Sequence, residues 1–177
     1  MVVMINGSFG VGKTTVARLL CRALPGSVIY DPEWFGFVLK RVPKQFYFPK
    51  PKPDDYQHTK LWRSSVAAGV QFFRFFTRGP VIVPMAFCDR QYFDEVVAGI
   101  ESFESKLKIF CLKASLETVR QRLVGRGDRI EGDGTDWITR RIVECAEAHQ
   151  NPHFGEPVET ENRTAQEVSE EIVLRLA

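Results

Sequence analysis

The sequence has little of what marks secreted, membrane or nucleic-acid-binding proteins. Its four cysteines form no CxxC pair, which argues against a disulfide scaffold and favours a reduced, cytoplasmic protein. The 24 Lys and Arg residues nearly balance 22 Asp and Glu residues, and the resulting net charge of +2 does not imply a nucleic acid partner.

Long apolar runs are also missing. Met1 to Ile5 is apolar, but it has neither the basic flank nor the small-residue cleavage site of a signal peptide. Arg74 and Arg78 interrupt the most apolar stretch, so no run approaches the roughly 18 residues of a spanning helix. We therefore expect no transmembrane segment.

What is present is the composition of an ordinary globular protein. Of the 177 residues, 44% are hydrophobic and 26% are charged. A chain of this length buries roughly 70% of the surface that its unfolded form exposes, so it can fold without a disulfide or a metal. A single domain over residues 1–177 is predicted.

Short apolar runs alternate with longer helical patterns along the chain. Such alternation is typical of an α/β fold with a parallel sheet. The expected strands are Val2 to Asn6, Val28 to Tyr30, Val81 to Met85, Leu107 to Leu112 and Val158 to Thr160. The expected helices are Lys13 to Leu24, Glu33 to Val42, Tyr56 to Thr77, Tyr92 to Ser102, Leu116 to Gly125, Trp137 to Gln150 and Ala165 to Leu176.

Two stretches interrupt this alternation. Pro43 to Asp55 is rich in proline and lysine, and Gly125 to Thr135 is rich in glycine, as loops are. We expect a substrate-side excursion over about residues 43–77 and a helical lid over about residues 122–140.

The helix expected from Tyr56 to Thr77 has two apolar faces. One face carries Trp62, Val66, Val70, Phe73 and Phe76, and the other carries Leu61, Ala68, Phe72 and Phe75. Because large aromatic side chains prefer burial, core packing on both sides is the favoured interpretation. The alternative is that part of this aromatic wall lines a ligand pocket.

One motif indicates the chemistry. Gly7-Ser8-Phe9-Gly10-Val11-Gly12-Lys13-Thr14 satisfies the pattern G-x-x-x-x-G-K-[ST] in full. A predicted strand precedes it and a predicted helix follows it, which is the order that a phosphate-binding loop (P-loop) requires. The motif predicts binding of ATP or GTP.

The residue types explain how such a loop works. Glycines let backbone N–H groups turn inward around a phosphate, and the following helix adds the partial positive charge of its N-terminus. Lys13 is expected to reach the β- and γ-phosphates, and the Thr14 hydroxyl is expected to hold Mg²⁺. The predicted nucleotide-binding residues are Gly7, Ser8, Phe9, Gly10, Val11, Gly12, Lys13, Thr14 and Thr15.

Beyond the P-loop, the chain resembles the ATP-binding tunicamycin-resistance (TmrB-like) family. The resemblance rests on the run from Ile5 to Thr14 and on later motifs. These motifs are Tyr30-Asp31-Pro32-Glu33 with Gly36-Phe37, Leu61-Trp62-Arg63, Ile82-Val83-Pro84-Met85, Ala114-Ser115, Glu117-Thr118, Arg122-Leu123, Arg126, Trp137 and Cys145. The resemblance implies a nucleotide-like or antibiotic-like substrate, with tunicamycin as the first candidate, and leaves open whether it is phosphorylated or only held.

More loosely, the layout is similar to that of small P-loop kinases such as the shikimate, gluconate, chloramphenicol and nucleoside-monophosphate kinases. This similarity implies a P-loop kinase-like three-layer sandwich, with a five-stranded parallel sheet in the order 2-3-1-4-5 and an arginine-bearing lid. It does not identify the substrate.

Asp31 and two arginines are the candidate catalytic residues beside Lys13. In the kinases that the chain resembles, an acid at the position of Asp31 accepts the proton of the attacking hydroxyl or holds the metal. A plain helix N-cap is the alternative for Asp31, and one residue could serve both purposes. Arg122 and Arg126 match the kinase pattern Arg-Leu-x-x-Arg and are expected to close over the transferring phosphoryl group, with a solvated charged face as the alternative.

The metal site lacks one expected ligand. Pro84-Met85 stands where the third strand would normally end in an aspartate, and Asp89 comes four residues later. The second metal-side position therefore falls to Asp31 or to water. Cys145 and His149 are four residues apart, which is incomplete as a zinc site.

The leading hypothesis is an enzyme that uses ATP and Mg²⁺ to phosphorylate a hydroxyl of a small acceptor. Asp31, Glu33, Trp62, Arg63 and Met85 are the residues predicted to contact that acceptor. Alternatives are a module that binds tunicamycin without chemistry, a metabolite or nucleotide kinase, and a nucleotide-hydrolysing switch, which the lack of N-K-x-D disfavours. The sequence leaves the oligomeric state open.

Overall fold

The structure is a computed structural model, and it describes residues 1–33, 57, 59–127 and 137–177. Three expectations fall wholly or mostly on other residues. These are the helix from Glu33 to Val42, the part of the substrate-side excursion before Lys60, and the middle of the lid. They lie outside the described residues and stay predictions.

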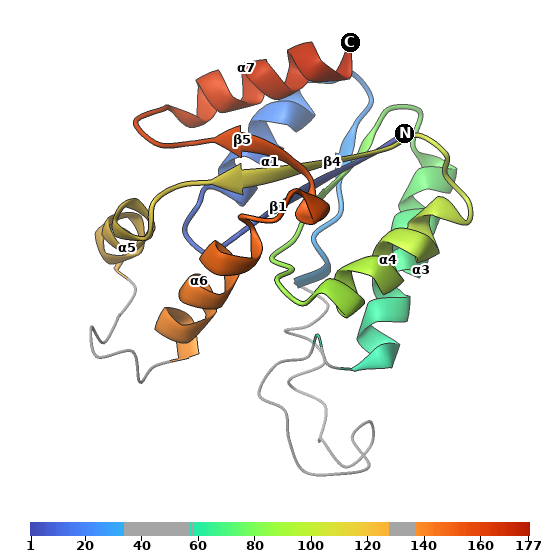
Figure 1. Cartoon of the computed structure of the whole chain (residues 1–177). Coiled ribbons are helices and arrows are strands. Elements are labelled where there is room, and N and C mark those ends of the chain that lie inside the picture. The colour runs from blue at the N-terminus through green and yellow to red at the C-terminus, as the bar shows by residue number, and fades with distance from the viewer. Residues whose placement is uncertain (34–56, 58, 128–136) are drawn as a thin grey trace.

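A parallel five-stranded sheet forms the centre of the molecule (Figure 1). Its strands are β1 (Val2–Gly7), β2 (Val28–Ile29), β3 (Val81–Pro84), β4 (Leu107–Lys113) and β5 (Glu156–Glu159). They lie in the order β2-β3-β1-β4-β5, and every pairing is parallel. The predicted fold class and strand order are therefore confirmed.

The middle strand β1 is buried along its whole length. Because successive side chains of a strand point to opposite faces, β1 contributes to two separate cores. Val2 and Met4 belong to the core on the face of α3 and α4. Val3 and Ile5 belong to the core on the face of α1 and α7. The continuous apolar pattern of β1 is what a strand covered on both faces requires.

Helices cover both faces of the sheet, so the domain has three layers (Figure 1). One outer layer holds α1 (Lys13–Ala23) and α7 (Ala165–Leu176), and the other holds α3 (Lys60–Phe76) and α4 (Arg90–Glu101). The remaining elements are α5 (Leu116–Gly125), α6 (Trp137–Ala148) and the short 3₁₀ helix η3 (Pro152–Phe154). In the described ranges, no helix combines the length and the apolar character that crossing a bilayer requires.

Helix α3 departs from the prediction that both of its apolar faces are packed. Trp62, Val66 and Val70 are fully buried between the sheet and α4. Leu61, Phe72, Phe75 and Phe76, in contrast, are exposed to solvent. The expectation of a core on both sides is wrong because a sheet covers one side of a helix in a three-layer domain and cannot cover the other.

The turn before β3 contacts the turn before β2 through two glycines. Gly79 N donates a hydrogen bond to the carbonyl oxygen of Gly26 at 3.1 Å. A methyl group placed on Gly79 would lie 2.4 to 2.6 Å from backbone atoms of Pro25, Gly26 and Ser27. The two parallel strands can begin side by side only because this position has no side chain.

Gly79→Ala is therefore expected to destabilise the fold by about 1–3 kcal/mol, the usual cost of forced overpacking. Gly125→Ala is the matched control, because a methyl group there meets nothing within 4 Å and alanine favours helix by up to ~1 kcal/mol over glycine. Urea denaturation of the two variants measures both effects. Equal stabilities for the two variants would contradict the close packing at Gly79.

Candidate functional site

The P-loop connects β1 to α1 at the centre of the sheet edge. β1 ends at Gly7 and α1 begins at Lys13. Gly10 and Gly12 have φ values of 77° and 109°, a backbone region that side chains with a Cβ rarely adopt. The two glycines thus allow the sharp turn that directs backbone N–H groups toward a bound anion.

Lys13 places its cation inside this loop. Its Nζ donates a hydrogen bond to the carbonyl oxygen of Ser8 at 2.9 Å, and it lies 5.5 Å from the centroid of the Phe9 ring. Burial lowers the pKa of Lys13, while the nearby charge of Glu33 opposes this shift. A desolvated cation of this kind gains strongly from an anionic ligand.

A pocket of about 450 Å³ opens beside the loop. Its size falls in the range of small-molecule sites. The exposed side chains of Thr14 and Thr15 are part of its wall, at the first turn of α1. The lining residues are Phe9, Gly10, Gly12, Lys13, Thr14, Thr15, Asp31, Glu33, Pro84, Arg122 and Arg126.

Two carboxylates line this pocket from the end of β2. Asp31 Oδ1 accepts a hydrogen bond from the backbone N of Glu33 at 3.0 Å, as an N-cap residue does. Asp31 also faces the pocket together with Glu33 and the P-loop hydroxyls. Its cap geometry and its place in the pocket are therefore compatible, as the sequence suggested.

The end of β3 supplies no carboxylate to this pocket. Pro84 pairs with Ile5 of β1 and lines the pocket. Asp89, the nearest acid after β3, instead accepts a hydrogen bond from Tyr92 N at 3.0 Å as the N-cap of α4. Among the described residues that line this pocket, the side-chain oxygens are the hydroxyls of Thr14 and Thr15 and the carboxylates of Asp31 and Glu33. These are ligand types that suit Mg²⁺.

Arg122 and Arg126 both reach the pocket from α5, but in different ways. Arg122 donates to the carbonyl oxygen of Val11 at 3.2 Å and to the carbonyl oxygen of Thr160 at 2.7 Å. It also donates to Thr160 Oγ1 at 3.0 Å. Arg126 is exposed at the end of the helix. Arg122 is thus anchored to the P-loop, whereas Arg126 lies at the rim of the pocket.

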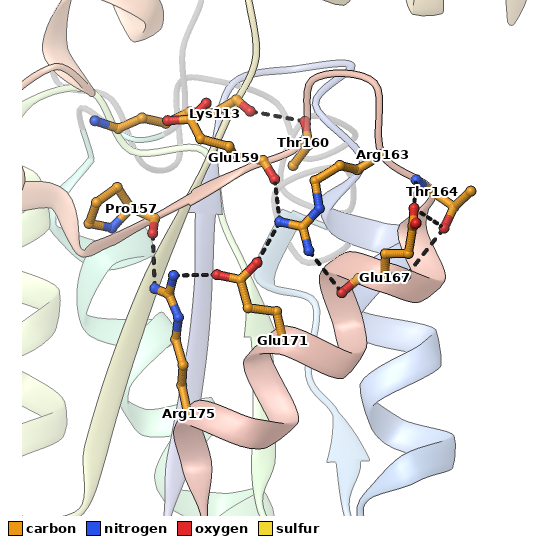
Figure 2. A network of polar contacts seen from close by, with 9 residues as sticks. All are labelled: Lys113, Pro157, Glu159, Thr160, Arg163, Thr164, Glu167, Glu171 and Arg175. Atoms are coloured by element: carbon orange, nitrogen blue, oxygen red, sulfur yellow. Dashed lines mark hydrogen bonds and ion pairs between the residues drawn. The ribbon is translucent and has the colours of Figure 1, made fainter.

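A network of polar contacts holds the loop that receives Arg122 (Figure 2). Thr160 Oγ1 donates to the carbonyl oxygen of Lys113 at 3.0 Å, and Arg163 donates to the carbonyl oxygens of Glu159 and Glu167 and to the carboxylate of Glu171. Thr164 caps α7 in a capping box with Glu167, as its spacing predicted. These contacts hold the chain between β5 and α7 as a wall beside the P-loop, on the side of α7.

A smaller cavity of about 160 Å³ extends along this wall. It shares Gly12, Thr15 and Arg122 with the main pocket and adds Thr160 and Arg163. No local pattern in the sequence marks these two residues. They enter the site only because β5 lies beside β4 and returns the chain to the P-loop.

The structure brings most predicted site residues together. Three residues that were predicted to contact the acceptor molecule, however, do not line this pocket. Trp62 and Met85 are fully buried in the core beneath α3. Arg63 is also buried, where Nε donates to Glu95 at 2.6 Å and Nη1 donates to the carbonyl oxygen of Gln57 at 2.6 Å. Their contact with an acceptor stays a prediction, and their burial among the described residues does not favour it.

One neighbour of the P-loop was not singled out as a site residue from the sequence. Trp137 begins α6, and its ring lies 5.5 Å from the ring of Phe9 at an interplanar angle of 63°. Phe9 therefore neighbours both this indole and the Lys13 cation.

Comparison with known families agrees with this geometry. A family model described as an AAA domain matches residues 2–152. The chain belongs to this AAA domain family. The match includes β1 to β4 and the whole P-loop, which are the parts of a nucleotide-binding fold. Among curated proteins, none matches the chain.

Several solved structures share the fold of this AAA domain. The tunicamycin resistance protein of Deinococcus radiodurans is 23% identical, with a TM-score of 0.75 over 99% of this chain and 96% of that one. A gluconokinase from Sinorhizobium meliloti is 17% identical, with a TM-score of 0.67 over 99% and 90%. Shikimate kinase from Acinetobacter baumannii is 14% identical, with a TM-score of 0.60 over 98% and 91%. Identities this low establish a common fold and leave the substrate open.

Lys13→Ala is expected to weaken ATP binding at least ~10-fold, because it removes the buried cation that is predicted to face the phosphates. Lys108→Ala is the matched control, since Lys108 is an exposed lysine of β4 outside the pocket. Isothermal titration calorimetry compares both variants with the wild type. Unchanged ATP affinity in Lys13→Ala would refute the assignment of this loop.

Proposed function

We propose that the protein is an ATP- and Mg²⁺-dependent phosphotransferase that acts on a hydroxyl of a small nucleoside-like or antibiotic molecule. The observation that carries the proposal is the composition of the 450 Å³ pocket. It combines the P-loop cation of Lys13, the carboxylate of Asp31 and the guanidinium groups of Arg122 and Arg126. Phosphoryl transfer requires these three kinds of group within reach of one another.

The nucleotide is assigned to the P-loop and the adjoining wall. The triphosphate would lie over Gly10 to Thr15, with Lys13 at the β- and γ-phosphates. Arg122 supports this assignment because its hydrogen bonds to the carbonyl oxygens of Val11 and Thr160 hold its guanidinium group beside the P-loop. The cavity along Thr160 and Arg163 continues from the P-loop and gives the rest of the nucleotide a place to extend.

Mg²⁺ is assigned to the Thr14 hydroxyl and to the carboxylate side of the pocket. Asp31 is the predicted metal-side acid, and Glu33 lines the same pocket two residues later. When bound, the metal would neutralise charge on the phosphate oxygens. β3 ends in Pro84 and not in an aspartate. The second metal-side position therefore falls to Asp31, Glu33 or water.

In the proposed reaction, an acceptor hydroxyl attacks the γ-phosphorus of ATP. The new bond joins the acceptor oxygen to phosphorus, the bond from phosphorus to the bridging oxygen of ADP breaks, and Asp31 accepts the hydroxyl proton. Lys13 and the arginines stabilise the negative charge on the transferring group. Arg126 is suited to close over this group because it is exposed at the rim of the pocket.

The first acceptor to test is tunicamycin. The fold likeness to the tunicamycin resistance protein of Deinococcus radiodurans supports this choice. The likeness to a gluconokinase and a shikimate kinase supports hydroxyl-bearing metabolites as the next candidates. Asp31 and Glu33 are the proposed acceptor-side residues that line the pocket.

A second candidate function is ATP-dependent binding of the antibiotic without chemistry. One observation favours it: Pro84 at the end of β3 leaves the described part of the pocket without an acid from that strand. Mass spectrometry of tunicamycin after incubation with protein, ATP and Mg²⁺ separates the two functions. A phosphate adduct on the antibiotic supports the enzyme, whereas tight binding with unmodified antibiotic supports sequestration.

Asp31→Asn is expected to lower turnover by about 100-fold or more while ATP affinity stays nearly unchanged. Asparagine caps a helix as well as aspartate does, so this change removes the charge and keeps the cap. Asp89→Asn is the control, because Asp89 caps α4 outside the pocket. Steady-state kinetics and thermal unfolding of both variants provide the measurement.

The two roles of Asp31 predict opposite patterns. If Asp31 only caps the helix, Asp31→Asn will keep full turnover, and Asp31→Ala will lose roughly 1 kcal/mol of stability. That pattern would exclude Asp31 as the base.

A further inference from the structure

One face of α3 is apolar and exposed. Phe75 is 83% exposed, Phe76 69%, Phe72 61% and Leu61 58%. At 3.6 residues per turn these side chains lie within about 60° of a single line along the helix, together with Ser64, Ser65 and Ala68. We call these seven residues the α3 face. The opposite side of the helix carries the buried residues Trp62, Val66 and Val70.

The phenylalanines of the α3 face form a contiguous patch. Phe76 is within 5.0 Å, centroid to centroid, of both Phe72 and Phe75. With roughly 150–250 Å² for a whole aromatic side chain, the three exposed rings leave on the order of 400 Å² uncovered. That is about half of the ~800 Å² that each partner buries in a standard interface. Leu61, Ala68 and the serines extend the same surface along the helix.

We propose that the α3 face is the interface of a symmetric homodimer, in which α3 packs antiparallel against α3 of a second copy. The inference is independent of the proposed function, because it rests on a surface outside the P-loop pocket. A two-fold axis brings the same patch of both copies together, so the patch must be complementary to itself. The sequence of α3 meets that condition.

The proposed two-fold axis passes beside Ala68, because residues at equal distances before and after Ala68 can pair across it. Leu61 precedes Ala68 by seven residues and Phe75 follows it by seven. Ser64 precedes it by four and Phe72 follows it by four. In an antiparallel pair centred on Ala68, Phe75 therefore meets Leu61 of the partner and Phe72 meets Ser64, while Phe76 lies opposite Lys60 at the edge of the contact. Large opposite small is the arrangement that lets two helices interdigitate closely.

Electrostatics favour the same pairing. None of the seven residues of the α3 face is charged, so the centre of the contact holds no ionised side chain that association would desolvate. Antiparallel packing places the positive N-terminus of one helix beside the negative C-terminus of the other. Lys60, the first residue of α3, would then lie next to the C-terminal end of the partner helix, where a cation is stabilising.

The first test measures the mass of the full chain in solution by light scattering and sedimentation. We expect the mass of two chains at about 50 µM, and at least a 100-fold weaker dimer for Phe75→Asp and for Phe72→Asp, since both are central to the patch. Leu174→Asp is the control, because Leu174 is 77% exposed on α7, in the opposite layer. Thermal unfolding confirms that each variant is folded.

The second test examines the two-fold axis. Ala68→Cys should form an intermolecular disulfide on mild oxidation, because the two Ala68 residues face one another. Ser64→Cys should not, since the two copies of Ser64 would lie about 12 Å apart along the helix axis, beyond the reach of a disulfide. The wild-type chain sets the background from its four native cysteines.

Several outcomes would overturn the proposal. A monomer up to about 100 µM excludes the dimer, and polydisperse aggregates exclude a closed symmetric contact. A dimer that persists in the Phe72→Asp and Phe75→Asp variants lies on another surface. A monomer that co-sediments with phosphatidylcholine–phosphatidylglycerol vesicles, and loses this binding in Phe75→Asp, assigns the face to a membrane surface instead.

Discussion

The central position of β1 in the sheet determines where the functional edge of the molecule lies. β1 pairs with β3 on one side and with β4 on the other, and it is buried on both faces. Its end at Gly7 therefore fixes where the P-loop begins. Asn6, the residue before that end, is itself fully buried. Its side chain accepts from Phe87 N at 2.9 Å and donates to the carbonyl oxygens of Phe87 and Phe154 at 3.3 Å.

This buried amide holds the connections after β3 and before β5 against the central strand. The connection after β3 leaves the carboxyl end of its strand, where an open parallel sheet forms its ligand crevice, and the connection before β5 leads into the edge strand beside β4. An unsatisfied amide at this depth would be costly. The hydrogen bonds of Asn6 therefore serve both the packing of the core and the position of the connections around the end of β1.

Much of this fold was accessible from the sequence because the signals were local. Continuous apolar runs marked the strands, and the spacing of Thr164 and Glu167 marked the start of α7. The P-loop glycines marked the nucleotide side of the site. The strand order came from the resemblance to P-loop kinases and not from the residues themselves.

The features that sequence reasoning missed depend on contacts between distant segments. The two faces of α3 have similar compositions, so only the position of the sheet decides which one is buried. Arg63 was predicted to contact the acceptor, yet it lies buried because Glu95, on the neighbouring helix α4, pairs with it. Arg122 was predicted as a mobile lid residue, and its bonds to Thr160 were not foreseeable because they span 38 positions. No local pattern encodes such pairs.

The contact between Phe9 and Trp137 makes Trp137 an intrinsic fluorescence probe of the P-loop. Trp137 is partly exposed, and its ring meets a residue of the P-loop itself. The emission of an indole depends on the polarity and on the quenching groups around it. Any rearrangement of the loop around a phosphate that moves the Phe9 ring would change the surroundings of this indole. Occupancy of the loop should thus be readable from the fluorescence of the unlabelled chain.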